Sequence, residues 1–308
     1  MKTKILVAAI AAAFVAVPAQ AKVSFSGQVS SVANLGGDFD ESFTITQNGA
    51  SGTRFRFKAD KKWGGITTAL RLEIQDSKDT SGGNNDEDLR YADISFAGAF
   101  GKISFGQGDG AANGVSEAYS NATGNYFAGV DGVDFAFGSL GGANGYNNLD
   151  FLSRNQRLRY DSPKFGGVQV SGSVRSIDGG ELALRYAGDF SGWKVTAQAG
   201  ASYTDSRDLA GIALGLQMPF GLTLGYRTVS ADEGPQETNT AAIGYRIGKF
   251  RTSIEGGTYT DADGVETDIS TVGFTYAGPV TLFASYGTVE TPGAEDFSAP
   301  IIGARMTF

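Results

Sequence analysis

Alternation of apolar and polar side chains, repeated along most of the chain, is the feature that most restricts its fold. In residues 53–62, Phe55 and Phe57 alternate with Arg54 and Arg56. Successive side chains of a β-strand point to opposite faces, so this pattern predicts a strand with one apolar and one polar face. Such segments are about ten residues long, which is the length that a tilted strand needs to cross a bilayer.

Turn residues divide the chain into sixteen such segments. They lie at 23–34, 53–62, 66–76, 88–97, 102–107, 153–161, 167–176, 181–188, 193–204, 208–218, 222–230, 238–248, 249–260, 267–277, 280–290 and 300–308. Tight connections with Gly, Pro and aromatic residues alternate with longer, acidic ones, and we place the tight side in the periplasm and the long side outside. An even number of strands lets a barrel close with both ends on one side. The sequence predicts an all-β fold, a 16-stranded antiparallel transmembrane β-barrel.

The first residues predict export. Lys2 and Lys4 precede an apolar run at 5–17, and Ala19 and Ala21 form a small-x-small cleavage site, so residues 1–21 read as a cleaved signal peptide. That run is shorter than the roughly 20 residues of a membrane-spanning helix. No ten consecutive apolar residues follow, which excludes a helical membrane protein and leaves 22–308 as the barrel domain.

The net charge and the absence of His and Cys exclude several classes of function. The formal net charge is −8, and −10 without the two lysines of the leader, which argues against nucleic acid as a partner. The chain has no His and no Cys, so Ser-His, Cys-His and His-metal chemistry are absent. We predict no enzyme, no cofactor and no metal site. A secreted β-sandwich or β-solenoid stays open, although no repeat of about 20 to 50 residues supports a solenoid.

Residues 109–152 form an unusually long connection. They are rich in Gly, Asn, Ser and aromatic residues, and they show neither helical nor strand periodicity. Compact domains rarely keep structureless loops longer than about 15 residues unless these have a function. Both ends adjoin predicted strands, so we expect this constriction loop to fold into a pore and to set its width.

Several motifs, in this order and spacing, resemble those of the general porins of Gram-negative outer membranes, most of all the α-proteobacterial ones. They are Val23-Ser-Phe-Ser-Gly27, Thr53-Arg-Phe-Arg-Phe-Lys58, Phe96-Ala-Gly-Ala-Phe-Gly-Lys-Ile-Ser-Phe-Gly106, Arg159-Tyr-Asp-Ser-Pro163 and the terminal Phe308. The resemblance implies a homotrimer of 16-stranded barrels whose third extracellular loop folds inward. It also implies contact with outer-membrane lipids and lipopolysaccharide. The last strand, which ends in Phe308, would be recognised by the barrel-assembly machinery.

The same resemblance suggests charges on opposite sides of the pore. The acidic loop motif of the family matches Asp131 and Asp134, the wall arginine of the second strand matches Arg54, and the arginine of the fourth strand falls on Asp93, which departs from the pattern. Alternation supplies the other inward cations, and the loop supplies further candidates. The predicted basic set is Arg54, Arg56, Arg71, Arg157, Arg159 and Arg175; the acidic set is Glu117, Asp131 and Asp134; the loop aromatics are Tyr126, Phe127 and Phe135.

Opposed fixed charges across a narrow aqueous gap orient dipolar solutes. We therefore predict a diffusion channel for small hydrophilic solutes and ions, with a mild cation preference. Two alternatives remain open: a channel specific for a sugar or phosphate, with the loop aromatics as a sugar slide, and a non-conducting surface or adhesin barrel. A barrel enzyme is disfavoured because the chain lacks a His base.

Overall fold

The structure is a computed structural model that describes residues 21–35, 44–46, 52–76, 87–115, 151–175, 179–205, 207–232 and 236–308. These residues form one antiparallel sheet of seventeen strands. The strands are β1 Lys22–Asn34, β2 Thr44–Thr46, β3 Arg54–Trp63, β4 Ile66–Asp76, β5 Glu87–Gly98, β6 Gly101–Asp109, β7 Arg154–Asp161, β8 Val168–Arg175, β9 Gly179–Phe190, β10 Trp193–Thr204, β11 Leu209–Gln217, β12 Leu222–Ala231, β13 Glu237–Ile247, β14 Phe250–Thr260, β15 Glu266–Ala277, β16 Val280–Glu290 and β17 Phe297–Thr307. None of the described residues belongs to a helix that is long and apolar enough to cross a membrane.

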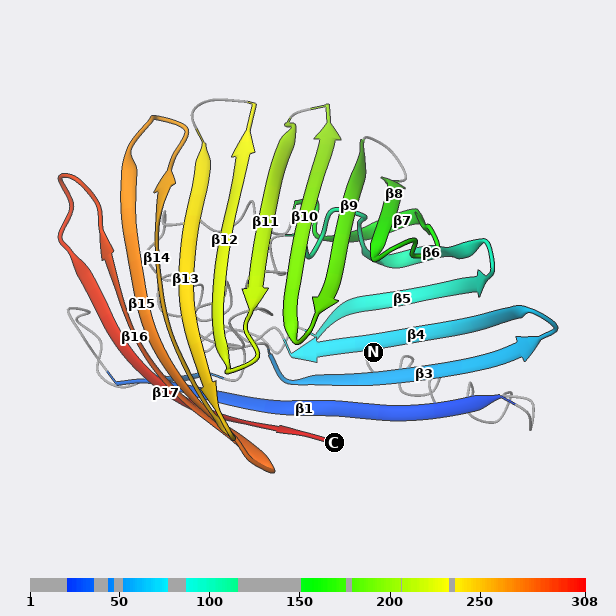
Figure 1. The fold of residues 1–308 in the computed structure, drawn as a ribbon, viewed down its shortest axis with the longest axis horizontal. Helices are drawn as coiled ribbons and strands as arrows, with labels where there is room; N and C mark the ends of the chain where they lie inside the picture. The colour runs from blue at the N-terminus through cyan, green and yellow to red at the C-terminus, as the bar shows by residue number, and fades with distance from the viewer. Residues whose placement is uncertain are drawn as a thin grey trace.

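The sheet closes on itself through β1 (Figure 1). From β3 to β17 each strand pairs with the next, while the first half of β1 pairs with β3 and its second half with β17. At the seam, Gly27 N donates to Phe308 O at 2.8 Å and Phe308 N donates to Gly27 O at 3.0 Å. Sixteen strands make the ring, and β2 adds a short pairing to the end of β1. The predicted 16-stranded antiparallel barrel is confirmed.

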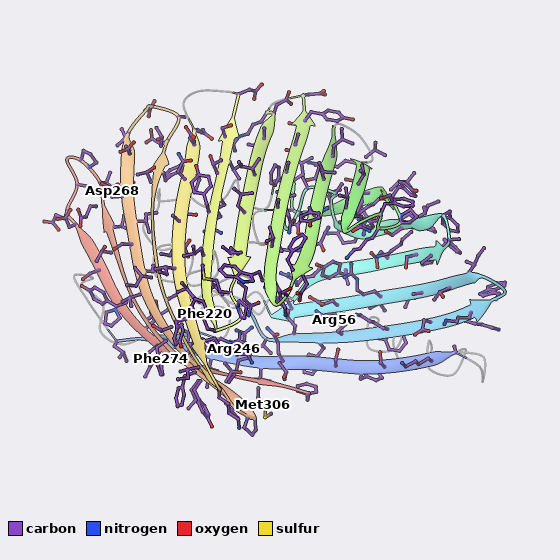
Figure 2. All side chains as sticks on the ribbon, in the orientation of Figure 1. Arg56, Phe220, Arg246, Asp268, Phe274 and Met306 are labelled. Atoms are coloured by element: carbon purple, nitrogen blue, oxygen red, sulfur yellow. The ribbon has the colours of Figure 1, made fainter. Side chains whose placement is uncertain are left out.

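The two faces of the wall differ in polarity along every long strand. In β15, Thr271 and Thr275 are buried on one face, while Val272 and Phe274 are exposed on the other. Figure 2 shows Phe274 and Met306 among many side chains on the outside of the wall. Exposed large apolar side chains on so many strands would be unfavourable in water, since each Å² removed from water contributes about 25 cal/mol. A band of this kind faces lipid, and the polar face lines the lumen.

Aromatic side chains gather at the tight connections, as the sequence predicts. The exposed ones are Trp63, Phe100, Phe165, Phe190, Trp193, Phe220 and Phe250. Amphipathic rings prefer the membrane interface, so these residues form a girdle at one rim of the barrel. Glycine makes such turns possible: Gly101 has φ +104°, and a Cβ there would lie 2.3 Å from Asp161 O.

The observed strands depart from the predicted ones mainly at their ends. Strand β2 was not predicted, because three residues are too few to show alternation. Strand β17 begins at Phe297, three residues before the predicted start at Pro300. The pairing with β1 ends at Ile301, so Pro300 needs no donor there, and its carbonyl accepts from Leu35 N at 3.0 Å.

Candidate functional site: the charged pore wall and the loop anchor

A belt of charged residues crosses the inner face of β3 to β8. Strand register places five charged residues and one glycine directly opposite one another, in the order Lys58, Arg71, Asp93, Gly106, Arg157 and Arg175. Because residues opposite each other in a sheet share a face, the inward parity predicted for Arg71, Arg157 and Arg175 agrees with this register. Four of the six are cations, so this part of the wall is predominantly basic.

Asp93 holds two of these arginines. Arg157 Nη2 lies 2.8 Å from Asp93 Oδ2, and Arg71 Nη2 lies 3.2 Å from the same oxygen. Arg71 also lies over the ring of Tyr91, with its Cζ 3.5 Å from the ring centroid. Asp93 is only 7% exposed and the Arg157 side chain 3%, so this pair is shielded from water, whereas the Arg71 side chain is 28% exposed. The position where the family resemblance leads one to expect an arginine therefore carries the carboxylate that orders the neighbouring cations.

Glu73 also binds two arginines, at a position nearer the long connections. It is buried, it forms an ion pair with Arg56, and it accepts from Arg90 Nε at 3.1 Å. The register of β4 and β5 shifts between Glu73 and Ile74, which leaves Arg90 as the extra residue of a β-bulge. Bulges re-aim side chains. Strict alternation therefore could not place Arg90 among the inward cations.

The constriction loop is tied to the inner wall at both of its ends by one carboxylate. Ala112 N donates to Glu181 Oε2 at 3.0 Å, and Leu152 N donates to Glu181 Oε1 at 2.9 Å. Glu181 lies on β9 and is 2% exposed. Ser173 Oγ on β8 accepts from Ala111 N at 2.8 Å. The two ends of the loop are thus held side by side, on the lumen face of β8 and β9.

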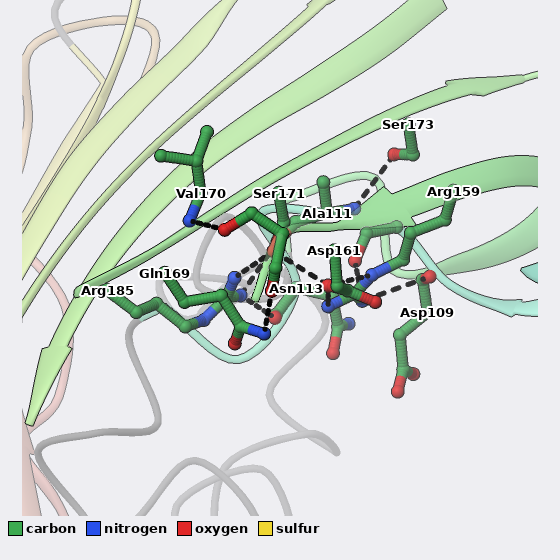
Figure 3. A network of polar contacts seen from close by, with 12 residues as sticks. Asp109, Ala111, Asn113, Arg159, Asp161, Gln169, Val170, Ser171, Ser173 and Arg185 are labelled. Atoms are coloured by element: carbon green, nitrogen blue, oxygen red, sulfur yellow. Dashed lines mark hydrogen bonds and ion pairs between the residues drawn. The ribbon is translucent and has the colours of Figure 1, made fainter. Parts of the chain in front are cut away.

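Arginines bind the backbone carbonyls of the first loop end (Figure 3). Arg185 Nη2 donates to Ala111 O at 2.7 Å and to Asn113 O at 2.9 Å. Arg159 Nη1 donates to Gly110 O at 2.7 Å, while its Nη2 lies 2.8 Å from Asp161 Oδ1. Charge-assisted hydrogen bonds of this kind are roughly twice as strong as neutral ones. The guanidinium groups of β7 and β9 therefore hold the loop as well as lining the lumen.

Small residues let the loop ends lie close to the wall. A Cβ on Gly110 would lie 1.7 Å from Glu181 Oε2, so only glycine fits there. On β10, Gly200 lies beneath Val115, and a Cβ at this position would come within 2.9 Å of the Val115 side chain. Ala112 and Val115 are fully buried. The loop ends form a small packed unit with β9 and β10.

The remaining predicted residues fall into two groups. Arg54 Nε donates to Gln75 Oε1 at 2.6 Å on the inner face of β3, and Phe308 lies at the seam with its ring centroid 6.0 Å from that of Phe55. Six predicted loop residues lie outside the described residues: Glu117, Tyr126, Phe127, Asp131, Asp134 and Phe135. The opposition of an acidic loop to a basic wall therefore stays a prediction.

Sequence reasoning missed the residues that hold the site together. Glu73, Glu181 and Arg185 have the inward parity of their strands, so alternation could have placed them on the lumen face. Their roles depend on which neighbouring strands supply partners, and alternation within one strand does not contain that information.

The other half of the lumen face is almost neutral. From β10 to β16 the inward residues are mainly Thr, Ser, Gly and Ala. The central exception is a buried pair in which Arg227 Nη2 lies 2.8 Å from Glu255 Oε1 and Arg227 Nε donates to Thr240 Oγ1 at 2.6 Å. The charges that could act on a solute midway through the lumen are therefore concentrated on β3 to β9.

Comparison with known proteins agrees with this architecture. The family model described as Gram-negative porin matches residues 7–294. No curated protein sequence matches the chain.

Solved porin structures resemble the fold over nearly its whole length. The anion-selective porin from Comamonas acidovorans has a TM-score of 0.64 at 16% identity, covering 94% of this chain and 100% of that one. A mutant of the Rh. blastica porin has a TM-score of 0.65 at 15% identity, covering 93% and 100%. In-vitro folded OmpT of Vibrio cholerae, in its trimer form, has a TM-score of 0.62 at 15% identity, covering 94% and 99%. The resemblance seen in the sequence motifs is confirmed, and this chain belongs to the Gram-negative porin family.

Proposed function

We propose that this porin, an outer-membrane channel for passive diffusion, passes small hydrophilic solutes with a mild preference for cations through a constriction built from residues 109–152. The observation that carries the proposal is the attachment of both loop ends to the lumen face at Glu181. A loop fixed at both ends on the inner wall has the lumen beside it, where its backbone polar groups meet water and not lipid.

The cation preference follows from the balance of charges. Many wall arginines share carboxylates or bind loop carbonyls, as Arg71 and Arg157 do at Asp93, so the basic wall is partly neutralised. The chain without its leader has a formal net charge of −10, and the loop contributes Glu117, Asp131 and Asp134. A field between these acids and the wall would orient dipolar solutes, because a narrow aqueous gap between low-dielectric walls screens charge weakly. No covalent step is involved, since porins are channels rather than enzymes.

The proposal includes assembly and export. We infer a homotrimer, supported by the trimer form recorded for OmpT of Vibrio cholerae. The basic and apolar leader supports cleavage after residue 21. Contact with lipopolysaccharide and recognition of the Phe308 strand by the barrel-assembly machinery complete the proposal, and the backbone bonds of Phe308 to Gly27 at the seam support a closing role for that residue.

Ion selectivity in planar bilayers tests the function. In a KCl gradient, the reversal potential of the wild type should indicate cation preference, and D131N combined with D134N should reduce it. R54A should increase it. D268N is the matched control, because Asp268 is exposed on the outer face of β15. Anion preference of the wild type would refute the selectivity, and a reversal potential unchanged by the loop and wall variants would refute the constriction. Saturable block by one sugar or by phosphate would indicate a substrate-specific channel instead.

A further inference from the structure

The two ends of the neutral half of the barrel carry opposite charge. At the tight connections of β10 to β17 the charged residues are cations, namely Lys194, Arg246, Lys249, Arg251 and Arg305. At the long connections they are acids: Asp205, Asp208, Asp232, Asp261, Asp263, Glu295 and Asp296 lie in or beside the connecting segments, while Glu237, Glu266, Asp268 and Glu290 have the outward parity of their strands and do not face the pore. Arg207 is the one cation among the described residues of those long connections. Figure 2 shows Arg246 and Asp268 at opposite ends of the wall.

Two of the cations at the tight end, Arg246 and Arg251, have the inward parity of their strands. Arg246 alternates with the outward residues Tyr245 and Ile247, and it lies directly opposite Arg251 on β14. Like charges directly opposite each other are unfavourable in a sheet, and nearby carboxylates normally offset them. In the described tight connections 218–222, 248–250 and 277–280 there is no acidic residue, whereas beside the connection 190–193 Lys194 lies directly opposite Asp189. Arg246 and Lys249 are exposed, so they are accessible to mobile anions from solution.

The middle of this half does not mask the charge at its ends. Its inward side chains are neutral except for Arg227 and Glu255, which form an ion pair with each other. Along this half of the wall, the fixed charges at the two ends therefore act on an ion with no unpaired charge between them. The mouth at the tight connections attracts anions and the mouth at the long connections attracts cations.

We propose that the cationic ring at the tight-turn mouth collects small anions and that, with the acidic ring at the other mouth, it makes the channel conduct asymmetrically. The proposal rests on the channel function stated above. When the long-connection side is electrically positive, cations enter through the acidic mouth and anions through the basic mouth, so both accumulate in the lumen and the current is large. With the opposite polarity, each ion must enter through the mouth that repels it, so the ion concentration in the lumen falls and the current is small.

Salt concentration sets the size of the effect. The screening length is about 30 Å at 0.01 M and about 3 Å at 1 M. A mouth potential of about one kT changes the local concentration of a monovalent ion about threefold. We therefore expect a current ratio of about two to three between the polarities at 0.01 M KCl, and equal currents at 1 M.

The experiment records single-channel current against voltage for the full-length porin in planar bilayers at both salt concentrations. Insertion direction is assigned with A294C, whose position is exposed in the connection between β16 and β17, and a bulky thiol reagent added to one chamber. The chain has no cysteine of its own, so the label reports one site. The expected result is a larger current at 0.01 M when the labelled side is positive.

Charge-removing variants test the residues. The triple variant K194Q, R246Q and K249Q should abolish the asymmetry while the channel still conducts. The control is K61Q, since Lys61 lies at the same rim but on the outer face, with its Nζ 5.9 Å from the ring centre of Trp63. Linear current at 0.01 M, asymmetry of opposite sign, or asymmetry retained in the triple variant would overturn the proposal while leaving the channel function intact. A protein that never conducts would refute the channel function itself.

Discussion

Strands β3 to β9 and strands β10 to β16 share one antiparallel backbone arrangement but carry different side chains on the lumen face. From β3 to β9 the lumen face carries arginines and carboxylates in shared pairs, such as Arg71 and Arg157 at Asp93. From β10 to β16 it carries small and hydroxyl side chains, and one isolated ion pair. The lipid face is alike in both, since alternation exposes apolar residues on every strand. Lipid therefore constrains the outside uniformly, whereas the inside is free to specialise.

The largest effect is expected when the contacts of Glu181 with the two ends of the constriction loop are removed. E181A should free the backbone N–H groups of Ala112 and Leu152, and each buried unsatisfied group costs about 1–3 kcal/mol. We expect an intact barrel with larger, noisier conductance and faster uptake of hydrophilic reporters. E181Q keeps one of the two acceptor oxygens, so it should show a smaller change. Conductance of E181A equal to that of the wild type would show that the anchor does not position the loop.

Buried ion pairs occur in both halves and allow a matched comparison. D93N and E255Q each remove the charge of a carboxylate that is less than a tenth exposed, and breaking a buried pair costs about 3–5 kcal/mol. Both variants should unfold at lower urea concentration. Only D93N should move the reversal potential toward anions, because it takes the carboxylate from Arg71, which is partly exposed, whereas Arg227, the partner of Glu255, is fully buried. An equal change of selectivity in E255Q would contradict the division between the halves.

Small residues on the neutral side provide a third test. G200A places a Cβ within 2.9 Å of Val115, and overpacking of this kind costs about 1–3 kcal/mol. We expect altered conductance with little change in barrel stability, since the strain falls on the loop. G256A is the control, because its nearest neighbour would be 3.9 Å away. Strong destabilisation of the whole barrel by G200A would argue against local packing.

The smallest effect is expected at the seam between the halves. F308A removes a ring that packs against Phe55 and over Gly27, and such aromatic pairs contribute about 0.5–1.5 kcal/mol. Because Phe308 is largely exposed, the loss of stability should stay small, while the yield of folded protein in the outer membrane should fall more clearly. F220A, on an exposed turn, is the control. Equal yields of F308A and F220A would show that Phe308 has no special role in assembly of the barrel.

Strand positions could be predicted because lipid demands strict alternation, and a slip of one residue would turn Arg157 or Arg159 toward lipid. Two things could not be predicted. A bulge breaks the parity at Arg90, and the partners of each arginine lie on neighbouring strands, so the roles of Asp93 and Glu181 depend on register between strands. The acids and aromatics of the loop lie outside the described residues, so their placement stays a prediction.

The attachment of both loop ends to Glu181 has a consequence for how such channels diversify. The distance between the ends is fixed at the wall, so the segment between them can gain or lose residues without any strain on the barrel. Each doubling of a flexible loop adds only about 0.6 kcal/mol of closure entropy. Under the constriction proposed above, pore width and barrel stability are separable traits, and related channels could change the first by insertion or deletion while the second stays constant.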